Sequence, residues 1–303
     1  MGLRVSRRSV LKGSAAVTLT AFAEPLRAQA PAVDAVTPAL VEAAKKDGKP
    51  APRKPNPPGK PGETSTGAKI GNLCEAHIRG YVGYGIRGAI WYQGESNAGR
   101  AYQYGTLFPT MIQNWRDDWL QDEFPFYFVQ LAPWEPAEPG TWPELRETQL
   151  KTLKMKNTGM AVITDVGDKT DIHPRKKQPV GERLALWALA KIYNLPVEYS
   201  GPQLESIEFK DGKAYLTFAH VAGGLSTSGD GTQGHGEPLT GFEVVGPEGN
   251  YSTAEARIEG NKVVVWSKDV TAPVAVRYGW KNYPVVNLFN RAGLPATPFR
   301  TDD

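Results

Sequence analysis

The 303-residue sequence contains a single cysteine, Cys74, and only four histidines. One cysteine excludes an internal disulfide framework, so the fold must be stabilised by packing. We interpret Cys74 as a small buried residue, because no partner pattern accompanies it. Pairs of His or Cys at ligand spacing are also lacking, and the sequence therefore predicts no metal site.

A strong excess of charge is lacking as well. The formal net charge is +3, but residues 1–67 carry 11 Lys and Arg against 5 Asp and Glu, which leaves 24 against 27 for the remainder. The remainder is therefore close to neutral. Because no basic stripe is left, neither nucleic acid nor an anionic membrane surface is expected as a partner.

The apolar segment near the N-terminus, residues 15–23, is too short and too rich in Thr and Ala to span a bilayer. It follows Arg7 and Arg8 and precedes a small-residue site that ends at Ala30. This pattern is typical of a twin-arginine export signal. We expect residues 1–30 to be a signal peptide, the protein to be exported by a bacterium to the periplasm or beyond, and no membrane contact after cleavage.

The next segment, residues 31–67, begins with a possible short helix at 38–46 and continues as a tract of Pro, Lys and Gly. Such a tract cannot pack a core, so we predict a linker or a long loop. An α/β domain is expected over 68–200 and a second domain over 201–303. The oligomeric state is left open by the sequence.

Buried-strand and helix patterns alternate over 68–200. The predicted strands are 86–93, 124–133 and 159–168, and the predicted helices are 101–119, 144–154 and 178–193. The first helix either covers its whole range or begins after Pro109. Its apolar stripe is expected to contain Leu107, Met111, Ile112, Trp115 and Trp119. Alternation of this kind predicts a parallel sheet with helices on both faces.

After residue 200 the pattern changes to short runs of alternating apolar and polar residues, separated by Gly and Asp turns. Such runs are typical of antiparallel strands. We expect a small sandwich-like β unit that packs on the α/β layer.

One histidine lies in a pattern that suggests chemistry. His173 follows Asp168 and Asp171 in the segment GDKTDIHP, between a predicted strand and a helix. A nearby carboxylate can hold one ring nitrogen and leave the other free as a general base. The competing interpretation is a surface loop whose Asp side chains only cap the following turn. His220 and His235 are expected to be structural or surface residues.

A second polar cluster, residues 93–97 (QGESN), ends the first predicted strand. It approximates the G-x-S-x-G elbow of many hydrolases, with Ala98 in place of the final glycine, which would make Ser96 a nucleophile. One spacing argues against this interpretation. Only one residue separates Asp171 from His173, whereas elbow enzymes carry the acid and the histidine on separate loops.

In the alternative interpretation, the same cluster forms the oxyanion side of a site. The Gly94 amide and the side chain of Gln93 or Asn97 would then donate hydrogen bonds to the oxygen that gains negative charge. Glu95 lies in the same turn and is a further candidate for substrate binding. Both polar clusters follow predicted strands, and functional loops of parallel sheets lie at the carboxyl ends of strands.

Several long segments, in order, resemble the bacterial sialate O-acetylesterases of the SGNH-hydrolase superfamily. They include IRGAIWYQGESNA, FPFYFVQLAP, NTGMAVITDVGD, DIHPRKKQPVGERLA and VRYGWKNYPVVNLFNRAGLPATPFRTD. The resemblance covers nearly all of residues 68–303. It implies a flavodoxin-like three-layer α/β/α fold and serine-type hydrolysis of acetyl esters on sialic acids or other sugars. It also implies that no metal or cofactor takes part.

Carried onto this sequence, the resemblance implies that His173 is the base and that residues 91–97 line the oxyanion side. Many SGNH enzymes place the acid three residues before the histidine, where this chain has Thr170. Asp171 is therefore the first candidate for the acid and Asp168 the second. The family also has an upstream SGQSNM segment and a glycine loop, neither of which occurs here, so Ser96 is the fallback nucleophile.

Three hypotheses for the function follow. The chain is an active acetylesterase that uses Ser96, an inactive fragment without the family's nucleophile segment, or a non-catalytic carbohydrate-binding protein. The sequence favours the fragment, because loss of a nucleophile removes several orders of magnitude of rate. Binding would use the stacking faces of Trp91, Tyr92, Trp134 and Trp142. A sheet without its early βα unit is also expected to keep an exposed apolar edge.

Overall fold

The computed structural model describes residues 46, 71–230 and 237–302. Its contacts divide the chain into two units, residues 1–74 and 75–303, and the second carries the fold described below. The expected signal peptide, the linker and the short helix at 38–46 lie outside the described residues, apart from Lys46. Cys74 is half-buried rather than buried. Among the described residues, no helix has both the length and the apolar content that crossing a membrane requires.

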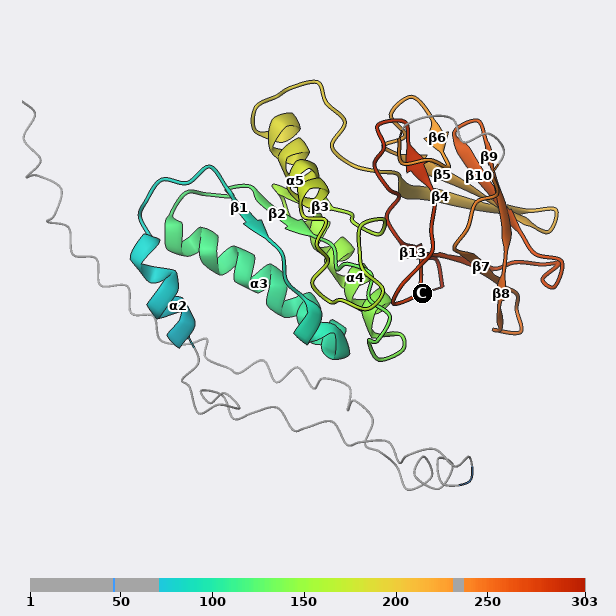
Figure 1. Ribbon diagram of the computed structural model, residues 1–303, viewed down its shortest axis with the longest axis horizontal. Coiled ribbons are helices and arrows are strands. Elements are labelled where there is room, and N and C mark those ends of the chain that lie inside the picture. Colours follow the sequence, from blue (N-terminus) through green and yellow to red (C-terminus); the bar gives the residue numbers. More distant parts are fainter. Residues whose placement is uncertain (1–45, 47–70, 231–236, 303) are drawn as a thin grey trace, which may run out of the picture. The chain divides into compact units, whose positions relative to one another are not determined.

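Three short strands form a parallel sheet in the order β1-β2-β3 (Figure 1). In the register of this sheet, Ile90 pairs with Tyr127, and Phe128 pairs with Met160. Each strand lies within the predicted run or at its start and is shorter than that run. The parallel sheet predicted from the alternating pattern is confirmed. The strands are β1 (Ala89–Trp91), β2 (Phe126–Val129) and β3 (Thr158–Ala161).

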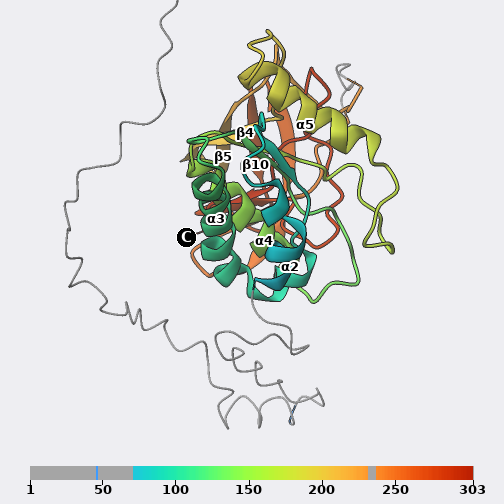
Figure 2. The same cartoon turned by 90° about the vertical axis from the view of Figure 1, so that its left-hand side faces the viewer.

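Helices cover both faces of this sheet. Phe126 and Phe128 pack against α3 and α4 on one face, whereas Tyr127 and Val129 pack against α5 on the other. Successive strand residues point to opposite faces, so a strand that is covered on both sides is apolar throughout. Figures 1 and 2 show α3 and α4 together and α5 apart from them. The predicted three-layer α/β/α arrangement is confirmed. The helices are α3 (Ala101–Trp119), α4 (Thr141–Lys151) and α5 (Gln178–Lys191).

The helix predicted over 101–119 is α3, and it runs unbroken through Pro109. The alternative start after this proline is wrong. Leu107 is 49% exposed and lies outside the buried stripe to which it was assigned, because the neighbouring Phe108 takes the inward direction. The buried positions are Ala101, Tyr104, Phe108, Ile112, Arg116 and Trp119.

The helix predicted over 144–154 consists of α4 and a 3-10 turn, η3 (Thr152–Lys154). It starts three residues before the predicted range, at Thr141, because Pro143 fits the first turn of a helix, where the missing N–H is not needed. Three further short helices complete this part of the chain. They are α2 (Asn72–His77), η1 (Arg79–Tyr81) and η2 (Glu95–Arg100).

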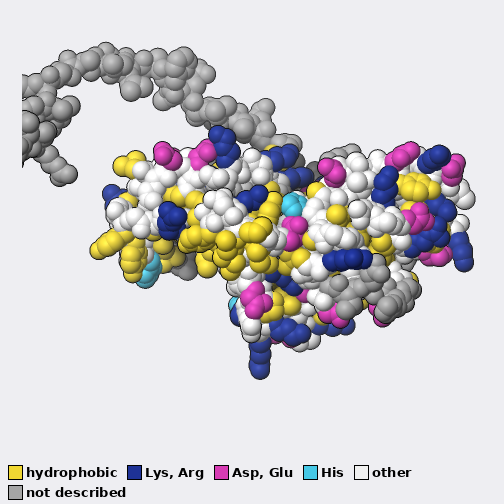
Figure 3. All heavy atoms as spheres, turned by 90° about the horizontal axis from the view of Figure 1, so that it is seen from above, with side chains coloured by type: hydrophobic (Ala, Val, Ile, Leu, Met, Phe, Trp, Pro, Cys, Tyr) yellow, Lys and Arg dark blue, Asp and Glu magenta, His cyan; other side chains and the backbone are white. Residues whose placement is uncertain are grey.

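β1 is an edge strand. It pairs with β2, and among the described residues no strand pairs with its other side. Ile90, on the face that α5 covers, is 71% exposed, because α5 contacts β2 and β3. Figure 3 shows hydrophobic side chains gathered over the α/β part of the molecule. The described part of the sheet therefore has the exposed apolar edge that the sequence predicted.

The chain after residue 200 forms antiparallel β structure, as predicted. One sheet has the order β4-β5-β10-β9, a second has β13-β11-β7-β8, and β12 pairs with β6. Leu216 of the first sheet and Val276 of the second belong to one buried core. We propose that residues 68–200 and 201–303 are two domains. The strands are β4 (Gln203–Lys210), β5 (Lys213–Ala219), β6 (Leu225–Ser226), β7 (Phe242–Val245), β8 (Tyr251–Thr253), β9 (Glu255–Glu259), β10 (Lys262–Trp266), β11 (Ala275–Tyr278), β12 (Phe289–Asn290) and β13 (Phe299–Arg300).

Candidate active site

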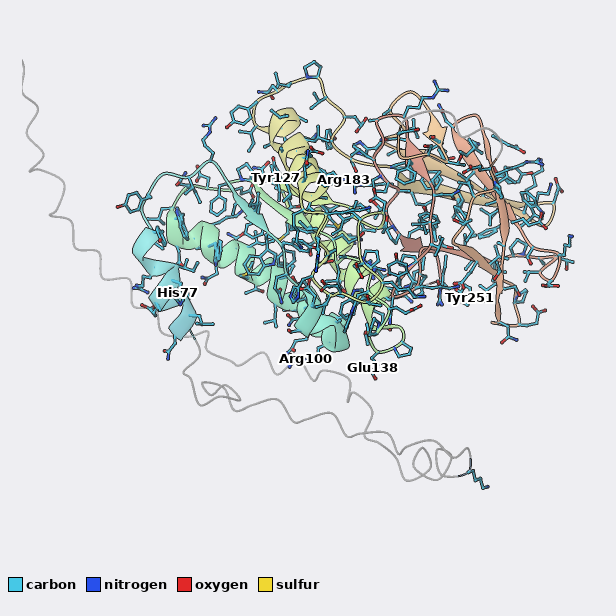
Figure 4. The ribbon with its side chains drawn as sticks, in the orientation of Figure 1. His77, Arg100, Tyr127, Glu138, Arg183 and Tyr251 are labelled. Carbon is cyan, nitrogen blue, oxygen red and sulfur yellow. The ribbon has the colours of Figure 1, made fainter. Side chains whose placement is uncertain are left out.

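The loops that follow the three parallel strands meet at a groove of about 350 Å³. Ser96 lines it after β1, Trp134 after β2 and Ile172 after β3. In parallel sheets, ligands bind at the carboxyl ends of the strands. Both polar clusters singled out in the sequence therefore border one groove. Figure 4 labels another lining residue, Glu138, on the loop before α4.

The cluster at 93–97 is held by hydrogen bonds of its own. Gln93 Nε2 donates to Asn97 Oδ1 at 2.8 Å, and the Tyr104 hydroxyl donates to Gln93 Oε1 at 3.3 Å. The backbone N–H of Asn97 donates to the Gly94 carbonyl at 2.8 Å, at the start of η2. The Gln93 side chain is therefore oriented before any ligand arrives.

Gly94 packs directly against α4. Its φ is +156°, and a Cβ at this position would lie 2.9 Å from Leu145 Cδ2 and 3.2 Å from Gln149 Nε2. The buried Gln149 accepts a hydrogen bond from the Leu131 amide at 2.8 Å and donates one to the Gln93 carbonyl at 3.3 Å. One side chain of α4 thus joins the carboxyl ends of β1 and β2. A side chain at position 94 would push the cluster away from this support.

Ser96 is exposed, and its hydroxyl has no hydrogen-bond partner among the described residues. In a nucleophile elbow, the serine itself occupies the strained turn. Here the unusual backbone belongs to Gly94, and Ser96 is not one of the positive-φ residues. The local backbone favours the oxyanion-side interpretation of the cluster over the elbow.

The loop between β3 and α5 carries the predicted base. Asp168 Oδ1 accepts the amides of Thr170 at 2.8 Å and Asp171 at 2.9 Å, and Asp171 Oδ1 accepts the amide of His173 at 2.8 Å. Both carboxylates therefore bond to backbone, as the capping interpretation expects. The His173 side chain is exposed, and its ring has no partner within the part of the chain that the structure describes.

The backbone bonds also set the charge of Asp168. The amides of Asp171 and Thr170 hold the pKa of this carboxyl below its ordinary value of 3.8, because they bond to its ionised form. Asp168 is therefore ionised at neutral pH and fixes the turn that leads to His173.

Two tryptophans form one wall of the groove. Trp134 is half-buried, and the ring centre of the buried Trp142 lies 5.2 Å from its own. The two indole N–H groups donate to the carbonyls of Thr170 at 3.2 Å and Ala132 at 2.8 Å. Both rings are thus held by hydrogen bonds to the main chain. Trp91, by contrast, packs in the core beneath α3.

Of the predicted site residues, Glu95 and Ser96 line the groove, and the loop of the predicted base reaches it through Ile172, the neighbour of His173. No hydrogen bond links the His173 ring to Ser96 or to Asp171 among the described residues. Glu95 lines the groove together with Ser96, whereas Gln93, Gly94 and Asn97 support it from behind. The roles of these seven residues stay predictions.

Sequence reasoning missed three residues that hold the site, namely Arg146, Gln149 and Asn282. Arg146 is fully buried, and burial lowers its pKa to about 9. Arg146 and Gln149 lie on the buried stripe of α4 with Leu145. Polar residues in the apolar stripe of a helix are the signal that could have identified two of them. Asn282 carries no comparable local signal.

Comparisons with known proteins agree with this geometry. The profile of the carbohydrate esterase family described as sialic acid-specific acetylesterase matches residues 70–189. Sialate O-acetylesterase of Mus musculus is 29% identical over 264 residues, which cover 75% of this chain and 46% of the mouse protein. The Homo sapiens enzyme is 32% identical over 182 residues, which cover 53% of this chain and 35% of the human protein.

A solved structure of a carbohydrate acetylesterase from Xanthomonas citri is 40% identical, with a TM-score of 0.68. The match covers 78% of this chain and 53% of that chain. This chain therefore spans about half, or less, of the length of these relatives.

The α/β/α layers, the groove at the strand ends and the solved relative define the class as carbohydrate esterases. Within this class, the chain belongs to the sialate O-acetylesterase family. The family resemblance drawn from the motifs is confirmed.

Proposed function

We propose that this chain hydrolyses O-acetyl esters of sialic acid or of another sugar by serine-type acyl transfer. The observation that carries this proposal is the single groove bordered by Ser96, Ile172 and Trp134 at the ends of three parallel strands. It combines a hydroxyl with an aromatic wall, and Ile172 brings the loop of His173 to its border. Acyl transfer needs a nucleophile and a general base at one site.

In the proposed reaction, Ser96 acts as the fallback nucleophile without the backbone of an elbow, and its Oγ attacks the acetyl carbonyl while His173 takes the serine proton. The Gly94 amide and the Asn97 side chain, which adjoin Glu95 and Ser96 of the groove lining, are the candidate donors to the developing oxyanion. His173 then returns the proton to the departing sugar hydroxyl, and water activated by His173 releases acetate from the serine. The first step requires about 2.6–3.2 Å between Ser96 Oγ and the His173 ring. Both groups are exposed.

Asp171 is proposed as the acid that orients His173, with Asp168 as the second candidate. Asp171 lies two residues before His173 in the chain, and its Oδ1 accepts the His173 backbone amide at 2.8 Å. Asp168 is committed to two backbone amides. If Asp168 turned toward the histidine ring, it would lose those two bonds, and the loop would become less ordered.

The direct test is acetate release from O-acetylated N-acetylneuraminic acid by the purified chain. We expect release by the unaltered chain and a loss of about 10²-fold or more for Ser96→Ala and for His173→Ala. Thr106→Ala is a matched control, since Thr106 is a hydroxyl residue on α3 outside the groove. Release no greater than that in buffer would overturn the proposed hydrolysis, and equal release above buffer by the unaltered chain and Ser96→Ala would exclude Ser96 as the nucleophile.

Sugar binding without hydrolysis is the second candidate function. It is favoured by the paired Trp134 and Trp142 wall and by the lack of a hydrogen bond between Ser96 and His173 in the described structure. Aromatic faces bind the apolar faces of sugar rings through dispersion contacts. Quenching of tryptophan fluorescence by the acetylated sugar, with no acetate released, would identify this function.

We further propose that the protein acts outside the bacterial cytoplasm. The paired Arg7 and Arg8 and the small-residue site at Ala30 support export. Cell fractionation tests this proposal. Replacing both arginines by lysine is expected to leave the chain in the cytoplasm, and unchanged export would contradict the twin-arginine route.

A further inference from the structure

A short segment of the β-rich part, directly after β11, reaches the wall of the groove. Asn282 Nδ2 donates to the carbonyls of Ala137 at 2.8 Å and Glu138 at 3.1 Å. The Asn282 carbonyl accepts the amide of Trp134 at 3.2 Å. One residue, more than 140 positions away in sequence, thus bonds to both ends of residues 134–138, the segment that lines the groove.

Arg146 links this segment to the sheet. Its guanidinium donates to the carbonyls of Leu131 at 2.9 Å, Lys281 at 2.7 Å and Asn282 at 2.8 Å. The side chain is buried, with 1% exposed, and its donors bond to main-chain carbonyls rather than to a carboxylate. An arginine placed in this way sets the spacing between Leu131 and residues 281–282, because its donors are fixed in one plane.

The opposite side of the wall is tied to the loop of the predicted base. Trp134 Nε1 donates to the Thr170 carbonyl at 3.2 Å, and the Glu135 amide donates to the Lys169 carbonyl at 3.1 Å. The Lys169 ammonium also lies 3.1 Å from Glu135 Oε2. The wall therefore has two anchors, one in the loop between β3 and α5 and one in the β-rich part.

We propose that Asn282 and Arg146 are positioning residues that hold Trp134 in place as the wall against which the sugar binds. The β-rich part is then a structural component of the groove and not an appendage. The claim that the sugar binds against Trp134 rests on the proposed function. The claim that Asn282 and Arg146 keep residues 134–138 ordered rests on the hydrogen bonds alone.

The test compares two asparagines of the same segment. Asn282→Ala removes the two bonds to the wall, whereas Asn287→Ala removes bonds to the Pro238 carbonyl and to Thr240, away from the groove. Arg146→Lys is a second variant that keeps the charge but loses the planar set of donors. All variants are made in the full chain, and thermal unfolding checks that each one folds.

Hydrogen exchange measures the wall without any substrate. Asn282→Ala is expected to speed the exchange of amides in residues 134–141 by about tenfold, because local opening becomes easier when two bonds are lost. Asn287→Ala is expected to leave this peptide unchanged. Equal exchange in both variants and in the unaltered chain would overturn the proposal.

Kinetics separate positioning from a general structural effect. For O-acetylated N-acetylneuraminic acid, Asn282→Ala is expected to raise KM about tenfold with little change in kcat, since a displaced wall weakens binding of the sugar. For p-nitrophenyl acetate, which has no sugar to contact the wall, kcat/KM is expected to stay within about twofold. An equal loss on both esters would overturn a role specific to the sugar.

A chain that releases no acetate would defeat the proposed hydrolysis but not this inference. The acetylated sugar is then titrated against tryptophan fluorescence, and Asn282→Ala is expected to raise Kd about tenfold relative to Asn287→Ala. If neither binding nor hydrolysis occurs, hydrogen exchange alone decides. Faster exchange in Asn282→Ala supports the positioning role, and unchanged exchange ends it.

Discussion

The two loops that carry the candidate chemistry are built in opposite ways. Residues 93–100, after β1, bond to side chains from neighbouring helices, Tyr104 of α3 and Gln149 of α4. Residues 164–177, after β3, form their turn through backbone bonds to Asp168 and Asp171 and leave His173 exposed. The first loop is held by side chains from the core. The second combines its own turn with bonds to Trp134, Glu135 and Arg183 outside the loop.

This difference matches the work proposed for each loop. Groups that stabilise an oxyanion act best when they are already oriented, because reorganisation during the reaction lowers their effect. A general base must reach first the nucleophile, then the leaving oxygen and then water. A loop that fixes its own turn but leaves the ring free meets this second need. Four substitutions test the contrast, from the largest expected effect to the smallest.

Removing the histidine ring should affect the rate but not the stability. His173→Ala is expected to lower acetate release by about 10²–10⁴-fold, the usual contribution of a general base. Thermal unfolding should be unchanged, because the ring has no partner in the described structure. His77→Ala, at the exposed end of α2, is the control. A variant with full activity would show that this loop does no chemistry.

Adding a methyl group to the fixed loop should affect stability. Gly94→Ala is expected to lower the free energy of unfolding by about 1–3 kcal/mol, because its Cβ would crowd Leu145 and Gln149. Gly99→Ala is the matched control, since a Cβ there meets nothing within 4 Å. Urea denaturation measures both variants. Equal midpoints for the two would contradict a core-fixed loop.

Loss of the tyrosine hydroxyl should cost less. Tyr104→Phe removes the donor to Gln93 and is expected to lower the free energy of unfolding by about 0.5–1.5 kcal/mol. Tyr102→Phe, on the same helix but 78% exposed, is expected to have no measurable effect. If both substitutions behave alike in urea denaturation, the contact does not hold the loop.

The smallest effect is local and depends on pH. The pKa of Asp168 is lowered from its ordinary value of 3.8. The bonds from the Thr170 and Asp171 amides to its ionised carboxylate therefore stabilise the turn fully above pH 3.8. This stabilisation is lost only as the pH falls through the lowered pKa. The protection factors of the Thr170 and Asp171 amides, which remove the intrinsic pH dependence of exchange, should follow this course. Asp168→Ala should give little protection at every pH, and Asp168→Asn, which keeps one acceptor oxygen but cannot ionise, should remove the pH dependence of the protection factors. A pH response in the Asn variant would assign it to another group.

Much of the α/β part could be predicted because its signals are local. The continuous apolar run of β2 and the helical spacing of α3 each lie within about twenty residues, and so does the step from β3 to His173. Periodicity also identifies the direction in which each residue points. Leu107 was misassigned because two adjacent apolar residues compete for one inward direction.

The support of the groove could not be predicted in the same way. Arg146 bonds to the carbonyl of Asn282, 136 positions away in sequence, and the Asn282 side chain bonds to the carbonyl of Ala137. Both acceptors are backbone carbonyls, which every residue has. No side-chain pattern marks a carbonyl acceptor. Sequence patterns therefore predict candidate reactive residues, whose roles stay predictions, and do not mark the residues that hold the groove wall in place.

The open edge at β1 has a consequence for handling the protein. Among the described residues, β1 has a strand neighbour on one side only, and such a strand can pair with the same strand of another molecule. β1 has no charged residue or proline that would hinder this pairing. Ile90 adds an exposed apolar side chain to that edge. The purified chain is therefore expected to associate as its concentration rises, so dilute solutions are the proper setting for comparing variants. Ile90→Lys is the substitution to try first when solubility limits an experiment.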